Sequence, residues 1–362
     1  MKIFSVTFLL FFIMIAVSGQ EPVKIGIAGL SHSHVVPLLR NLDRADIDVV
    51  GIAESDTALS ARYARQFNID RSIIYTSLEE MLEKTRPEGV VTFTSIYDHL
   101  KVVEACAPLG IHVMVEKPLA VSMKHARKME KLARENNILL LTNYETTWYP
   151  SNHEGLNMIN DNEIGELRKI IVYDGHQGPK EINVNSEFLD WLTDPVLNGG
   201  GAVIDFGCYG ANLVTWILNG QKPESVVASL KQYKPDVYPK VDDDATLMLN
   251  YPNLEVVINA SWNWPFNRKD MHIYGTEGYL LIDDAQTIRY RLNDGDGEKT
   301  KKASPDAWTY DDAFTFFAAA VNGGTKVMPA DLSSLENNLL VVEILDAAKK
   351  SSRTGKKVKL KK

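Results

Sequence analysis

Between Val23 and Thr142 the chain alternates short apolar runs with amphipathic stretches long enough to form helices. Strands that alternate with helices of this length indicate a parallel sheet covered by helices on both faces. We therefore predict a doubly wound α/β domain over residues 22–142. In such sheets ligands bind beyond the carboxyl ends of the strands, so the loops that follow the strands are the places to look for function. The predicted strands carry the sequences VKIGIA, DVVGIA, GVVTFT, HVMVE and ILLLT.

The pattern changes after Tyr144. Apolar or alternating segments such as KIIVYDG, ATLMLNY and LEVVINAS follow one another with turn residues between them, which is typical of antiparallel strands. One helix is expected among these strands, at residues 210–220, and two more close the chain, at 313–323 and 331–351. We predict a second α/β domain over residues 143–362, built on a large, mostly antiparallel sheet.

The first 19 residues have the layout of a secretory signal peptide. Lys2 precedes a largely apolar run from Ile3 to Val17, and the small residues Ser18 and Gly19 follow. The run is shorter than the roughly 20 residues of a membrane-spanning helix, so we favour cleavage before Gln20 over an uncleaved anchor. The prediction is an exported protein, periplasmic or extracellular, with no stable membrane insertion after cleavage.

Charge and cysteine content exclude some functions. The net charge of −8 gives no basic footprint for nucleic acid. The two cysteines are far apart and have no ligand-type neighbours at a metal-binding spacing. No metal centre is expected from them.

The stretch GLSHSHV after the first predicted strand sits where a dinucleotide-binding loop belongs. Gly29 permits the tight turn, but the G-x-G-x-x-G spacing places Ser31 and His34 where glycines are usual. A helix that starts here would aim free N–H groups at an anion. Glu54, at the end of the second strand, could accept hydrogen bonds from both ribose hydroxyls, which favours NAD over NADP; equally, Glu54 or Asp56 could cap the next helix.

A zinc site at His32 and His34 is the weaker interpretation of this loop. Histidines two positions apart on a turn do not share a helix face, and no carboxylate lies between them. We predict that they line the cofactor loop and that the protein binds no metal.

Two later stretches carry chemistry. In VMVEKPLA a buried strand ends at Glu116 and Lys117, which puts an ammonium in the ligand crevice, where it can polarise a hydroxyl or carbonyl. A solvent-exposed lysine at the start of a helix would give the same sequence pattern. In GGGAVIDFGCY the glycines allow close backbone approach, and Asp205 and Tyr209 are four apart, on one face of a helix. The two side chains could transfer protons during catalysis. Alternatively, Tyr209 could be a core tyrosine and Asp205 its hydrogen-bond partner.

These motifs in this order, EKPLA and then W-x-x-D-P…G-G-G-A-x-x-D-x-G-x-Y, resemble the Gfo/Idh/MocA family of NAD(P)-dependent oxidoreductases, as do VDDDATLMLNYPN and IYGTEGYLLID. The resemblance implies a Rossmann domain followed by an α/β domain whose open sheet supports the substrate and often a dimer. Tyr209 stands where most members have histidine, as in the glucose–fructose oxidoreductase type.

The resemblance also implies roles for individual residues. Lys117, Asp205 and Tyr209 are the expected catalytic residues. Trp191 and His176 are candidates for substrate contact. The expected cofactor contacts are Gly29, Ser31, His32, Glu54, Thr94, Ser95, His99, Glu116, Lys117 and Asn143.

The sequence therefore predicts a secreted NAD-dependent oxidoreductase that moves hydride to or from a secondary alcohol or ketone of a carbohydrate-like substrate. Because free NAD is scarce outside the cytoplasm, we expect the cofactor to be tightly held. Either Tyr209, its phenol pKa of about 10 lowered by Lys117, or Lys117 itself moves the proton. The alternatives are an NAD-dependent glycoside hydrolase that works by transient oxidation and elimination, and a non-catalytic NAD-binding protein. A homodimer or homotetramer is expected.

Overall fold

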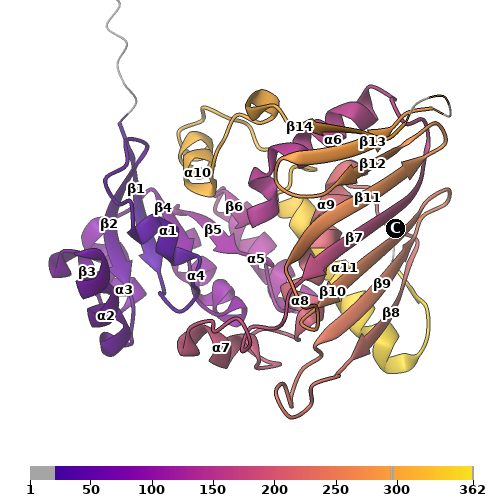
Figure 1. Ribbon diagram of the computed structural model, residues 1–362. Coiled ribbons are helices and arrows are strands. Elements are labelled where there is room, and N and C mark those ends of the chain that lie inside the picture. The colour runs from indigo at the N-terminus through magenta and orange to yellow at the C-terminus, as the bar shows by residue number, and fades with distance from the viewer. Residues whose placement is uncertain (1–20, 294, 296, 361–362) are drawn as a thin grey trace, which may run out of the picture.

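The computed structural model describes residues 21–293, 295 and 297–360. The predicted signal peptide, residues 1–19, lies outside these described residues and stays a prediction. Within them, no helix combines the length and the apolar character that crossing a bilayer requires. Figure 1 shows an N-terminal α/β unit beside a large, twisted sheet that runs along the opposite side of the molecule.

The N-terminal unit is a six-stranded parallel sheet in the order β3-β2-β1-β4-β5-β6. Its central strands are buried on both faces, as their uninterrupted apolar runs require. The order reverses between β1 and β4, where loops from both strands leave the sheet side by side, and this confirms the predicted doubly wound domain. Its elements are β1 (Val23–Ala28), α1 (Val35–Leu39), β2 (Ile47–Ala53), α2 (Thr57–Phe67), β3 (Ile74–Tyr75), α3 (Leu78–Thr85), β4 (Gly89–Thr92), α4 (His99–Cys106), β5 (His112–Glu116), α5 (Met123–Glu135) and β6 (Leu140–Asn143).

The second sheet has nine strands in the order β14-β13-β12-β11-β7-β10-β9-β8-β15. All neighbours are antiparallel except β7 and β10, so the mostly antiparallel α/β domain is also confirmed. Helices α9 and α11 cover the face turned toward the first sheet (Figure 1). The elements are α6 (Pro150–Asn160), β7 (Leu167–Gly175), α7 (Ser186–Leu192), α8 (Ala202–Asp205), α9 (Gly207–Ile217), β8 (Ser225–Lys231), β9 (Asp244–Asn250), β10 (Glu255–Ser261), β11 (Arg268–Gly275), β12 (Tyr279–Ile282), β13 (Thr287–Arg291), β14 (Lys299–Lys302), α10 (Ala313–Val321), α11 (Leu335–Thr354) and β15 (Val358–Lys359).

The two units are interleaved near the C-terminus. The end of β6 at Asn143 coincides with the expected change of domain, but α10 packs its phenylalanines into the core of the first sheet. Helix α11 contacts both units, because Leu339 and Val342 lie in the core behind β5 and β6 while Val341 and Ile344 lie behind the large sheet. The C-terminal part of the chain thus joins the cores of the two sheets.

Two predicted helices differ from expectation. The helix after Gly29 is only five residues long, and no side chain caps its first turn. The helix expected to carry both Asp205 and Tyr209 is broken at Phe206, which separates α8 from α9. The close contact of Gly201 lies at the start of α8: a Cβ there would lie 1.8 Å from the carbonyl oxygen of Asp242, whose carboxylate accepts the N–H groups of Gly201 and Val203. This contact fixes the start of α8, and the chain turns again at Phe206.

Candidate active site

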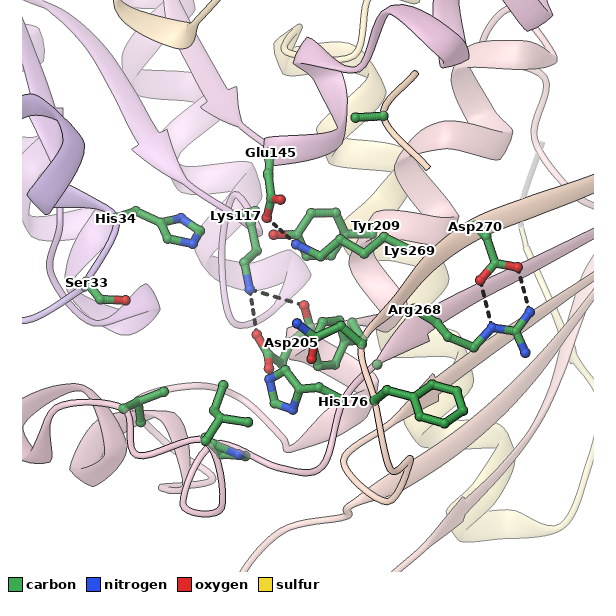
Figure 2. Close-up of a pocket in the computed structure, with 18 of the residues that line it drawn as sticks. Ser33, His34, Lys117, Glu145, His176, Asp205, Tyr209, Arg268, Lys269 and Asp270 are labelled. Carbon is green, nitrogen blue, oxygen red and sulfur yellow. Dashed lines mark hydrogen bonds and ion pairs between the residues drawn. The ribbon is translucent and has the colours of Figure 1, made fainter. Parts of the chain in front are cut away.

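A cavity of about 640 Å³ lies at the carboxyl ends of the first sheet's strands, between the two units. Residues of the loop after β1, Lys117 after β5 and Glu145 after β6 meet residues from β7, α8, α9 and β11 there (Figure 2). The position agrees with the general rule for open α/β sheets.

Lys117 and Asp205 form a buried ion pair at the base of this cavity. The Lys117 Nζ lies 2.5 Å from Asp205 Oδ1 and also donates to the Asp205 carbonyl oxygen. The other carboxylate oxygen accepts the indole N–H of the fully buried Trp262 at 3.0 Å. Burial alone would lower the pKa of Lys117 and raise that of Asp205, but each charge reverses the effect on the other, so both stay ionised.

Tyr209 lies between two ammonium groups. The Nζ atoms of Lys117 and Lys269 are 5.1 and 4.8 Å from its ring centroid, and Lys269 is itself paired with Glu145 (Figure 2). Burial raises the pKa of the Tyr209 phenol well above its usual value, and Glu145 and Asp205 raise it further. The expectation that Lys117 would favour the phenolate is therefore wrong, because burial and the nearby carboxylates of Glu145 and Asp205 raise the pKa of the phenol. Tyr209 presents a protonated hydroxyl.

Asp205 and Tyr209 do not form the pair expected for residues four apart on one helix. The break at Phe206 turns Asp205 toward Lys117 and Trp262, while Tyr209 lines the cavity beside them. The interpretation of Asp205 as the hydrogen-bond partner of a core tyrosine is likewise wrong. Both side chains nevertheless reach the same cavity.

Most backbone N–H groups of the loop after β1 are already used. Gly29 donates to Ala53, Leu30 to the Glu54 carboxylate, His32 to Phe93, and His34 to the His32 ring. Among the described residues of this loop, only Ser31 and Ser33 have N–H groups without a partner. Because α1 is so short, the expectation that its N-terminus would bind an anion is not supported, and these two serines are the better candidates.

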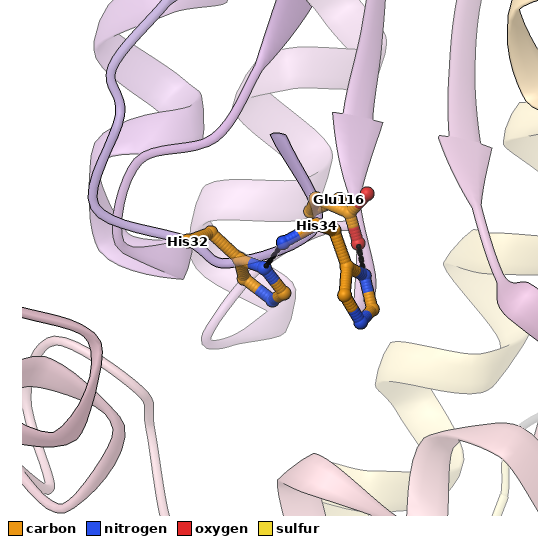
Figure 3. A group of neighbouring side chains, drawn as sticks. All are labelled: His32, His34 and Glu116. Carbon is orange, nitrogen blue, oxygen red and sulfur yellow. Dashed lines mark hydrogen bonds and ion pairs between the residues drawn. The ribbon is translucent and has the colours of Figure 1, made fainter. Parts of the chain in front are cut away.

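His32, His34 and Glu116 form a compact cluster beside the loop (Figure 3). His34 Nδ1 lies 2.9 Å from Glu116 Oε2, and Glu116 Oε1 accepts from Asn143. Burial lowers the pKa of His32 well below its usual value, and its Nδ1 accepts the His34 N–H. Neutral His32 then carries its proton on Nε2 and offers the cavity a donor instead of a metal-binding lone pair. The sequence analysis expected His32 and Glu116 both to contact the cofactor, but it did not predict that this carboxylate pairs with His34, since Glu116 lies on another strand.

The remaining predicted cofactor residues surround this loop. Asp56, and not Glu54, caps α2. The Glu54 carboxylate, just after β2, accepts hydrogen bonds from the backbone N–H groups of Leu30 and Asp56. The Ser95 hydroxyl donates a hydrogen bond to the Asp98 carboxylate, and the Thr94 hydroxyl donates one to the Ser95 carbonyl oxygen.

His99 is fully buried beneath the loop that carries Lys117. Burial lowers its pKa to about 4, and its Nδ1 contacts the Leu119 carbonyl oxygen. His99 therefore supports the loop from behind.

The two substrate candidates have different positions. His176 lines the cavity, and its Nδ1 accepts the N–H of Gly178. Trp191 is not part of the cavity lining; it is buried, with its ring packed against His32 and Phe188. A stacking role for Trp191 on substrate is thus not supported. Trp262, also considered for sugar stacking, is buried away from the cavity lining and donates its indole N–H to Asp205. Sequence reasoning missed Lys269 and Glu145, because β11 of the second sheet brings Lys269 to the cavity beside Glu145, which follows β6.

Comparison with known proteins agrees with this architecture. Residues 23–144 match the NAD-binding Rossmann-fold domain of the GFO/IDH/MocA oxidoreductase family, and residues 156–281 match that family's C-terminal domain. The chain belongs to the Gfo/Idh/MocA family. Its family-type NAD domain also contains features that fit the cofactor: the Ser31 and Ser33 N–H groups without partners, and Gly29 at φ +80°.

Individual relatives of this family member are distant. A pig trans-1,2-dihydrobenzene-1,2-diol dehydrogenase is 28% identical over 62% of this chain, and the match spans only 63% of that enzyme's length. Among solved structures, an aldose–aldose oxidoreductase from Caulobacter crescentus has a TM-score of 0.79 at 19% identity, covering 94% of this chain and 100% of that one. An inositol dehydrogenase homologue from Azotobacter vinelandii with NAD+ has a TM-score of 0.81 at 17% identity, covering 94% and 98%. At these identities the structural matches establish the fold alone.

Proposed function

We propose that this chain is an NAD-dependent dehydrogenase that interconverts a secondary alcohol and a ketone on a sugar or polyol. The observation that carries the proposal is the buried Lys117–Asp205 pair beside the Tyr209 ring, in a cavity at the carboxyl ends of an NAD-type sheet. The similarity to dihydrodiol, aldose and inositol oxidoreductases supports the same class of reaction.

The protein groups act on the substrate oxygen. In the reducing direction, the Lys117 ammonium and the Tyr209 hydroxyl both donate hydrogen bonds to the carbonyl and stabilise the alkoxide that develops there. One of them then gives its proton. In the oxidising direction, the hydroxyl proton passes to Lys117 as its own proton moves to Asp205, which lies 2.5 Å away. Bound NAD supplies the chemistry of accepting or giving the hydride.

Ser31, Ser33, His32 and Glu54 are the residues that would hold this cofactor on the Rossmann side. We further propose that the cofactor is tightly bound and that the protein is exported; the apolar run 3–17 with Ser18 and Gly19 after it supports export. We also propose that the open face of the large sheet forms the interface of a homodimer or homotetramer.

The first experiment is to purify the protein from Gln20 onward, denature it, and identify the released nucleotide by mass. We expect NAD or NADH, and nicotinamide reduction or oxidation with a panel of sugars and polyols. A protein that contains no nucleotide and takes up no added NAD would contradict the proposal. Release of reducing sugar from a glycoside without an acceptor would instead indicate the hydrolase mechanism.

A further inference from the structure

The cavity contains no spare positive charge for an anionic substrate. Among its described lining residues, the Lys and Arg side chains are Lys117, Arg268 and Lys269. Lys117 is paired with Asp205 and Lys269 with Glu145. The Arg268 guanidinium binds both oxygens of Asp270, at 2.7 and 2.6 Å. A phosphate or carboxylate on the substrate would find each of these cations already neutralised by a carboxylate.

Carboxylates in the same cavity also disfavour an anionic substrate. Asp283 and Asp284 line it as well. Asp283 is paired with Arg289, and Asp284 accepts backbone N–H groups from Gln286 and Thr287. The lining therefore carries at least as much negative as positive charge, which disfavours sugar phosphates and sugar acids.

The cavity is also lined by a group of apolar side chains, its apolar wall. Phe266, in the turn between β10 and β11, is 68% exposed, and Ile182, in the segment after β7, is 42% exposed. Pro179 and Val184 line the cavity next to Ile182. Single exposed apolar residues are common, but a group that lines one cavity together with a reactive ion pair is typical of a ligand-binding surface.

The apolar wall belongs to the second unit. All four residues come from the second unit, whereas the loop expected to hold the cofactor comes from β1 of the first unit. The cofactor would enter from the side of His32 and Ser33. Phe266 and Ile182 are thus available to contact a group attached to the reacting sugar.

We propose that the substrate is an uncharged sugar or diol that carries an apolar substituent, such as an aryl glycoside, with the substituent seated against Phe266 and Ile182. This inference rests on the proposed dehydrogenase function. It identifies Phe266 as a specificity-determining residue, since the reacting hydroxyl is held at Lys117 and Tyr209, away from the wall.

The test compares methyl glycosides, phenyl glycosides and phosphorylated forms of the same hexoses as substrates of the NAD-loaded enzyme. We expect kcat/KM to be about tenfold higher for the phenyl than for the methyl glycoside, as about 1.4 kcal/mol of apolar contact would give. Phosphorylated sugars should be poor substrates. Phe266→Ala should remove most of the phenyl preference, mainly by raising KM for the phenyl glycoside. Leu109→Ala, at a residue 61% exposed in the first unit and outside the cavity, is the matched control and should keep the preference.

Equal kcat/KM for phenyl and methyl glycosides, or a preference for the phosphorylated sugar, would overturn the inference while leaving the dehydrogenase function intact. A change of oligomeric mass in Phe266→Ala would also overturn it, because it would assign Phe266 to a subunit contact. Failure of the dehydrogenase function itself would show differently, as absence of bound nucleotide and of hydride transfer with every substrate.

Discussion

At the scale of single residues, the chemistry depends on a few buried charges whose partners are specific. Lys117 and Asp205 are each about 5% exposed, so neither can rely on water to stabilise its charge. Removing one partner from such a pair leaves an uncompensated charge and costs about 3–5 kcal/mol, whereas removing both costs far less. Stability and catalysis at this pair can therefore be separated experimentally.

We predict that Lys117→Met lowers turnover by at least about 10²-fold and lowers the free energy of unfolding by about 3–5 kcal/mol. The double variant Lys117→Met with Asp205→Asn should recover much of the stability but none of the activity. Urea unfolding and steady-state rates of the two single variants and the double variant provide the measurement. A double variant as unstable as the sum of the singles would show that the pair is not coupled.

Removing the charge of the Asp174 carboxyl should stabilise the protein, in contrast to removing Lys117 or Asp205. It is 1% exposed on β7, and its Oδ2 has no hydrogen-bond partner among the described residues. Burial raises its pKa well above the ordinary value, despite the opposing effect of Lys269. The folded state then binds a proton more tightly than the unfolded state, so stability falls as pH rises above about 3.9 toward the folded-state pKa.

We therefore predict that Asp174→Asn raises the Tm at pH 7, by about 2–4 °C for each kcal/mol gained, and gives no such gain at pH 3, where both states are protonated. Asp205→Asn, whose carboxyl has a lowered pKa, should lower the Tm at pH 7. Thermal unfolding at the two pH values distinguishes these cases. A destabilised Asp174→Asn at pH 7 would mean that the carboxylate is ionised and paired in the folded protein.

At the scale of elements, the loop after β1 depends on one conformation. Gly29 has φ +80°, and a Cβ there would lie 2.6 Å from the Thr94 methyl and 3.1 Å from the Thr94 backbone nitrogen. Gly110 has a similar φ of +71° but open space around it. Comparing substitutions of the two glycines therefore separates the cost of backbone strain from the cost of steric conflict.

We predict that Gly110→Ala costs about 1 kcal/mol of stability from backbone strain alone. Gly29→Ala should cost about 1–3 kcal/mol more, because the loop must move away from β4, and it should weaken NAD binding. Urea unfolding and calorimetric titration with NAD measure both effects. Equal costs for the two substitutions would show that the loop after β1 adapts without strain.

At the scale of the whole molecule, helices cover one face of the nine-stranded sheet and leave the other open. On β8, β9 and β11, Val227, Met248 and Tyr274 are 39%, 36% and 37% exposed. Apolar side chains gathered on an open sheet face are typical of an interaction surface.

We predict that Met248→Lys shifts the protein from an oligomer toward a monomer, since a buried lysine without a partner is costly at an interface. Sedimentation velocity gives the mass directly. Leu109→Lys, at an exposed position on the first unit, should leave the mass unchanged. A monomeric wild-type protein, or an unchanged mass for Met248→Lys, would exclude this face as the interface.

The sequence alone determined the two-part α/β architecture and the strand-end position of Lys117, because apolar periodicity and strand–helix alternation are local properties. It also placed Asp205 and Tyr209 in one motif. Their relation was decided by tertiary structure: Asp242, distant in sequence, fixes the start of α8, and the break at Phe206 turns Asp205 toward Trp262. The protonation of Tyr209 was equally beyond the sequence, since burial and neighbouring carboxylates set it. Local pattern specifies which elements form, whereas the charge state and partners of a buried group depend on which distant segments pack around it.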